Sequence, residues 1–79
     1  MHSLKEKRTI VKSIVEKTKN KFNVSIAEID SQDLHGEIVL GFACVTTETR
    51  HAQSMLQRVI NYIENNTEAV VTEVMTEIL

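Results

Sequence analysis

Four basic residues near the N-terminus recur at a spacing that could bind phosphate. In a helix, Arg8, Lys12 and Lys19 would fall within about 40° of one another, with Lys5 beside them. Like charges on one helix face repel each other, and a phosphate backbone would relieve that repulsion. The pattern therefore predicts RNA or phosphate contacts. The simpler interpretation is an ordinary solvated helix face, partly neutralised by Glu16.

The charges of the chain are divided unevenly, which supports a local basic surface. Residues 1–21 hold seven basic and two acidic residues, a net charge of +5, whereas residues 22–79 hold two basic and nine acidic residues, a net charge of −7. No aromatic side chain interleaves with the basic residues, and no motif of a single-strand RNA reader is present. Any RNA binding is therefore expected to depend on shape and charge.

The remaining reactive side chains do not form a recognisable catalytic or metal-binding pattern. His2, His35 and His51 lack the spacing of a zinc site, and Cys44 is expected to be a small buried hydrophobic residue. The two glycines form no loop that could cradle a phosphate. We therefore expect no enzyme activity, no metal, no cofactor and no small-molecule substrate.

Acidic residues gather around one predicted loop. They could pair as acid and base or hold a cation, but their spacing matches no calcium loop. A soluble acidic loop is the expected role of the four residues Glu28, Asp30, Asp33 and Glu37.

Length and composition indicate one small soluble domain. The chain has 79 residues, of which 42% are hydrophobic and 25% charged, so a single domain over residues 1–79 is expected. No apolar run approaches the roughly 18 residues of a membrane span. The N-terminal residues become charged from Lys5 onwards, without the hydrophobic core of a signal peptide. We expect a cytoplasmic protein without a membrane partner.

Hydrophobic periodicity predicts a helix and then two strands. The helix begins at Leu4, with Ser3 and Glu6 as a capping box, and ends near Asn20. A strand with alternating faces follows from Phe22. After a turn-rich loop, residues 37–46 are apolar on both faces, which is typical of a central strand.

A second helix over residues 48–64 has the clearest amphipathic pattern, and residues 69–79 resemble an edge strand. The expected order is helix, strand, strand, helix, strand. The other face of the sheet is expected to be a partner surface. The residues expected in the core are Leu4, Val11, Ile14, Val15, Met55, Leu56, Val59, Ile60 and Ile63, packed on Val24, Ile26, Leu40 and Phe42.

Several strings of residues resemble the YlxP-like family of small bacterial proteins. The strings are HSLKEKR at 2–8, KFNVSIAEI at 21–29, Asp33-Leu34 and Leu40-Gly41. The resemblance implies a ferredoxin-like βαββαβ fold, a two-layer α+β sandwich with both helices on one face of a mainly antiparallel sheet. Family members have no established activity. Their genes often lie beside those of translation factors, which implies a role near RNA or the ribosome.

The chain departs from the family pattern because it lacks the residues of the first strand, giving the order α-β-β-α-β. Three outcomes stay open: an upstream start, a strand from another chain in the gap, or a last strand that moves beside the strand containing Gly41. The leading hypothesis is a non-enzymatic accessory protein that binds RNA or the ribosome. The alternative is a homodimerisation module that uses an open sheet edge or face.

Overall fold

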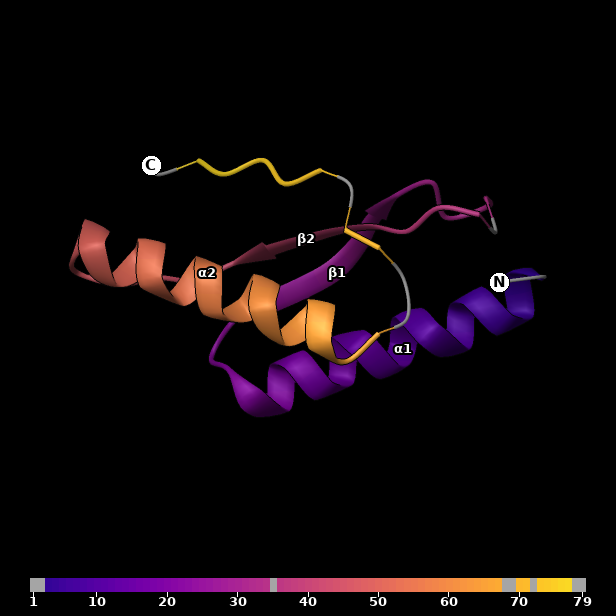
Figure 1. Ribbon diagram of the computed structural model, residues 1–79, viewed down its shortest axis with the longest axis horizontal. Helices are drawn as coiled ribbons and strands as arrows, with labels where there is room; N and C mark the ends of the chain where they lie inside the picture. The colour runs from indigo at the N-terminus through magenta and orange to yellow at the C-terminus, as the bar shows by residue number, and fades with distance from the viewer. Residues whose placement is uncertain (1–2, 35, 68–69, 72, 78–79) are drawn as a thin grey trace.

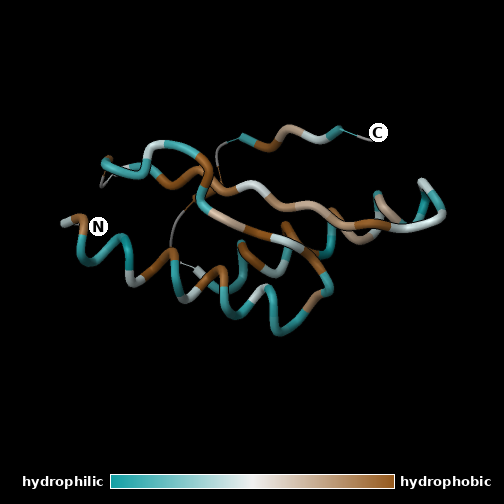
Figure 2. Tube along the Cα trace, turned by 180° about the vertical axis from the view of Figure 1, so that it is seen from behind, coloured by the Kyte–Doolittle hydropathy of each residue, from teal (hydrophilic) through white to brown (hydrophobic). Residues whose placement is uncertain are grey.

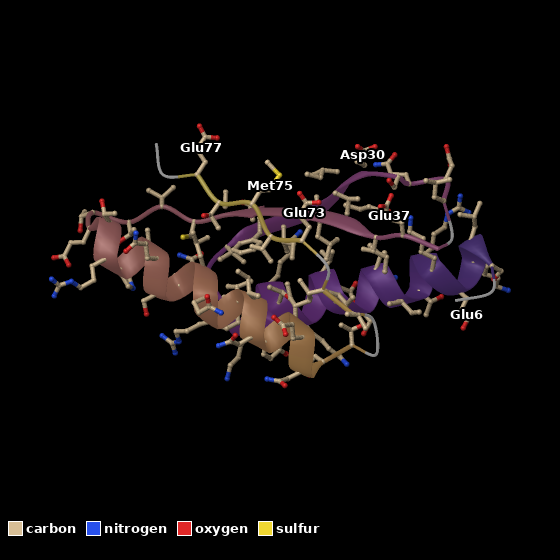
Figure 3. The ribbon with its side chains drawn as sticks, turned by 45° about the horizontal axis from the view of Figure 1, so that its top comes forward. Glu6, Asp30, Glu37, Glu73, Met75 and Glu77 are labelled. Carbon is tan, nitrogen blue, oxygen red and sulfur yellow. The ribbon has the colours of Figure 1, made fainter. Side chains whose placement is uncertain are left out.

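The computed structural model describes residues 3–34, 36–67, 70–71 and 73–77. Helix α1 spans Leu4–Lys21, strand β1 Ser25–Asp30, strand β2 Val39–Ala43 and helix α2 Thr49–Asn65 (Figure 1). The two strands form an antiparallel hairpin, and both helices lie on the same side of it (Figures 1 and 3). The α+β arrangement expected from the sequence is confirmed at this level.

Helix α1 begins where its capping signal predicted. The hydroxyl of Ser3 accepts a hydrogen bond from the Glu6 N–H at 3.1 Å, which satisfies one of the free donors at the helix start. The helix ends at Lys21, and the N–H of Phe22 donates to the carbonyl of Thr18. Its buried face consists of Lys7, Val11, Ile14 and Thr18, which recur at helical spacing and face the hairpin.

The register of the hairpin separates the side chains of its two faces. Ile26 pairs with Phe42 on the inner face, towards the helices, and Ala27 pairs with Gly41 on the outer face. The register shifts between Glu28 and Asp30. A Cβ at position 41 would lie 3.0 Å from two side-chain carbons of Ile29, so the glycine leaves room for Ile29 on the outer face.

The hydrophobic core is small. Only Val11, Ile14, Ile26 and Val59 are buried apolar side chains among the described residues. Figure 2 shows further hydrophobic residues along the strands and in the C-terminal segment. The other residues expected in the core are half-buried, namely Leu4, Val15, Val24, Leu40, Phe42, Met55, Leu56, Ile60 and Ile63.

The apolar face of helix α2 is less buried than its amphipathic pattern predicted. It packs against α1, and the ring of Tyr62 contacts that of Phe22 edge to face, with centroids 5.5 Å apart. It approaches neither strand as closely as α1 approaches β1. Val59 is therefore the one buried residue of α2.

The predicted last strand is wrong for the part of residues 69–79 that the structure describes. Residues 70–71 and 73–77 have no strand conformation, and positions 69, 72, 78 and 79 lie outside the described residues. Val70 and Met75 are more than four-fifths exposed. Propensity alone does not form a strand, and in the described part of this segment no residue pairs with a neighbouring strand.

The two predicted strands are present but shorter than expected. The first begins at Ser25 rather than Phe22, because Phe22 caps α1. The second spans Val39–Ala43, and β1 is its single neighbour, so its central position in a sheet is not observed in the described residues.

Thr18 provides a test of the packing between α1 and the hairpin. Its side chain is fully buried, and among the described residues its hydroxyl has no hydrogen-bond partner. A buried hydroxyl that has lost water without gaining a partner lowers stability. We expect Thr18→Val to raise the free energy of unfolding by about 1 kcal/mol. Urea denaturation measures this change, and a loss of stability would show that the hydroxyl contributes a favourable contact.

Candidate functional site

The four basic residues singled out in the sequence all lie on one flank of α1. The side chains of Lys5, Arg8, Lys12 and Lys19 are exposed, and none forms an ion pair within the described part of the chain. They lie roughly 120° around the helix from its buried face. The four charges are therefore exposed on one flank of α1, an arrangement that both a phosphate-binding surface and an ordinary solvated helix face would have.

The position of α1 increases the accessibility of this flank. The two helices are offset along the long axis, so that the N-terminal part of α1 extends past the end of α2 (Figure 1). Lys5, Arg8 and Lys12 belong to the N-terminal half of α1, whereas Lys19 lies in its last turn. Lys19 also lines a shallow depression with Ile26 and Phe42 of the hairpin. From Lys5 to Lys19 the helix rises about 21 Å.

A fifth basic residue of α1, Lys7, has a different role that sequence reasoning missed. Its side chain is only 1% exposed, and its ammonium lies 2.8 Å from Oε2 of Glu28. The same Nζ donates to the carbonyls of Ser31 at 2.5 Å and Leu34 at 2.6 Å. Lys7 thus anchors the hairpin loop to α1. The sequence did contain an indication of this role, because helical spacing places Lys7 on the same face of α1 as Val11, Ile14 and Thr18.

The acidic residues of the hairpin loop stabilise the loop itself. Ser31 has a positive φ of 55°, its N–H donates to Oδ1 of Asp30, and its hydroxyl donates to Oε2 of Glu37. Asp30 and Glu37 are visible at this end of the hairpin in Figure 3. Within the described part of the chain, no group of three His, Cys, Asp or Glu side chains could hold a metal ion.

The remaining candidate residues are dispersed. His51 is exposed at the start of α2, and its Nδ1 lies 2.9 Å from the hydroxyl of Thr46. Cys44 is half-buried, less than the full burial expected from the sequence. His2 and His35 lie outside the described residues.

Comparison with known proteins gives a family match that covers almost the whole chain. The model of the family described as "Protein of unknown function (DUF503)" matches residues 1–76. The chain belongs to the DUF503 family.

A curated relative agrees with the family model. The DUF503 chain is 41% identical over 75 residues to "Uncharacterized protein YlxP" of Bacillus subtilis (strain 168), which covers 95% of this chain and 82% of the relative. This result confirms the resemblance to the YlxP-like family. No solved structure matches the DUF503 chain. Within the described part of the DUF503 chain, neither helix is long and apolar enough to cross a membrane.

Proposed function

We propose that this DUF503 protein is a non-enzymatic, cytoplasmic accessory protein that binds RNA, alone or in the ribosome, through the basic flank of α1. The basic flank consists of Lys5, Arg8, Lys12 and Lys19. The observation that supports the proposal is that all four side chains are exposed, share one flank and have no acidic partner in the described part of the chain.

The electrostatics of the basic flank favour a polyanionic ligand. Lys7, which has a buried acidic partner, is withdrawn from the surface, so it does not add to the charge that faces solvent. The unpaired charges of the basic flank repel each other and attract phosphate, whose neutralisation releases counterions. The rest of the chain is acidic, which confines the attraction for RNA to α1.

We further propose that members of this family have a ferredoxin-like fold. The order α1, β1, β2, α2 and the placing of both helices on one side of an antiparallel hairpin match the inner part of a ferredoxin-like βαββαβ domain. We take this as the fold of the family. In this fold no strand covers the basic flank of α1.

Salt-dependent binding of a short labelled RNA duplex tests the proposal. If all four residues contact phosphates, the logarithm of the binding constant falls against the logarithm of salt concentration with a slope of about −3.6. Replacing two basic residues by acidic ones should weaken binding at least tenfold at about 50 mM salt, and it should lower the slope. The test variant is Arg8→Glu/Lys12→Glu.

The opposite flank of α1 provides a matched control. Lys17 and Lys21 are exposed on the same helix and lie roughly 140° or more around it from Lys12. Lys17→Glu/Lys21→Glu makes the same change in net charge and should keep most of the affinity. Equal losses in both double variants would mean that net charge, rather than the basic flank, governs binding. Absence of binding at low salt would overturn the proposal.

A further inference from the structure

The aromatic side chains of this chain are engaged in packing. The sequence has Phe22, Phe42 and Tyr62 and no tryptophan, and each of the three rings is half-buried. Phe22 and Tyr62 contact each other edge to face, and Phe42 lies opposite Ile26 on the inner face of the hairpin. Proteins that read single-stranded RNA stack two or three unpaired bases on exposed rings. Among the described residues, which include all three rings, no such platform is formed.

The side chains of the basic flank suit phosphates better than bases. Three of the four are lysines, whose compact ammonium attracts phosphate as a point charge, and Arg8 alone carries a planar guanidinium. Thr9, the exposed polar residue next to Arg8, uses its hydroxyl to donate to the carbonyl of Lys5 at 3.1 Å. The flank is therefore equipped to contact the sugar-phosphate backbone, which carries no sequence information.

The four charges are held in a line by one regular helix. Helix α1 is continuous over 18 residues, with the Ser3 hydroxyl capping its start. Lys5, Arg8 and Lys12 fall within about 10.5 Å along the helix axis, and Lys19 follows about 10.5 Å further on. A duplex presents phosphates at fixed positions on two strands, whereas a single strand must be ordered on binding, at a cost in entropy. A rigid line of charges therefore matches a duplex better than a single strand.

We propose that the ligand of the basic flank is double-stranded RNA, contacted through its phosphates irrespective of sequence. This inference rests on the proposed function and names the class of RNA that the same residues bind. Lys5, Arg8 and Lys12 contact one strand, and Lys19 contacts the other strand across the wide, shallow minor groove. The N-terminal part of α1 extends past the end of α2 (Figure 1), which leaves room for a ligand as wide as a duplex.

Fluorescence anisotropy with paired RNA probes tests the inference. The probes are a labelled duplex of about 16 base pairs and each of its two strands alone. We expect the duplex to bind at least about tenfold more tightly than either strand at about 50 mM salt. With four phosphate contacts, the salt slope should be about −3.6 for the duplex and about −2.8 for a single strand. A duplex of unrelated sequence should bind within about twofold of the first.

Two substitutions at one position separate phosphate contact from base stacking. Arg8→Lys keeps the positive charge but removes the guanidinium plane, and it should keep the duplex affinity within about threefold. Arg8→Gln removes the charge and should lower the salt slope by about 1. Phe42 lines the shallow depression beside Lys19, so Phe42→Leu tests the nearby ring. This variant, with helix content checked by circular dichroism, should also keep the duplex affinity.

The possible failures of the inference and of the proposed function are distinct. Equal or tighter binding of the single strands, lost in Arg8→Glu/Lys12→Glu, would exclude a duplex ligand but leave the RNA-binding role of the flank. A tenfold loss of duplex affinity in Arg8→Lys would show that the guanidinium reads or stacks on bases, contrary to the inference. Absence of binding to both duplex and single strands would overturn the inference and the proposed function together.

Discussion

Lys7→Met is expected to lower the free energy of unfolding by about 3–5 kcal/mol. Methionine keeps the apolar stem of lysine but removes the ammonium that contacts Glu28, Ser31 and Leu34. The Glu28 side chain is only 16% exposed, so its charge would stay largely buried without a partner. An unpaired buried charge is more costly than the loss of a surface contact. Urea denaturation followed by circular dichroism measures the change.

Two further variants isolate the cause of this effect. Lys5→Met makes the same substitution at an exposed position two residues away, where we expect a change within about 0.5 kcal/mol. Lys7→Met/Glu28→Leu removes both charges and should recover much of the lost stability. A Lys7→Met variant as stable as Lys5→Met would mean that the buried ammonium contributes nothing to the fold.

The second large effect is expected at the centre of the core. Ile26→Ala should lower the free energy of unfolding by about 2–5 kcal/mol, because it leaves a cavity that its neighbours fill only in part. Ile26 is 4% exposed on the inner face of β1, and it is one of four buried apolar side chains among the described residues. A core this small has few other contacts to compensate.

Ile29→Ala is the matched control for this substitution. It makes the same change on the same strand, but Ile29 is 63% exposed on the outer face. We expect a loss below about 1 kcal/mol in the same denaturation experiment. Similar losses for Ile26→Ala and Ile29→Ala would contradict the assignment of inner and outer faces.

Local signals were sufficient to predict the helices and the hairpin. Ser3 followed by Glu6 located the start of α1, because a helix end leaves N–H groups that only a nearby side chain can satisfy. The alternation of Ser25, Ile26 and Ala27 predicted one buried and one exposed face, which the register confirms. Both signals act over a few residues and do not depend on distant parts of the chain.

The features that depend on distant partners could not be predicted in the same way. Val70, Val71 and Val74 have strand propensity, but a strand forms only beside another strand. Figure 3 shows Met75 pointing away from the body of the molecule. Lys7 was missed for a related reason, because its partners lie 21 to 27 positions later in the chain.

Helical spacing alone determines which side chains share a flank, so the sequence was sufficient to group the four basic residues of α1, whose role in binding stays a prediction. The role of the acidic loop residues was predicted only in outline. Asp30 accepts a hydrogen bond from the Ser31 N–H and Glu37 accepts one from the Ser31 hydroxyl, around a residue whose positive φ no pattern in the sequence indicated.

The anchoring of the hairpin loop by Lys7 also limits how the length of this loop can vary among related chains. Surface loops usually accept insertions and deletions. Here the carbonyls of Ser31 and Leu34, three residues apart, must both reach one ammonium. An inserted or deleted residue between them would separate the two carbonyls, whereas an insertion at the exposed Gly36 would not. Length differences between related hairpins are therefore expected after Leu34 rather than before it.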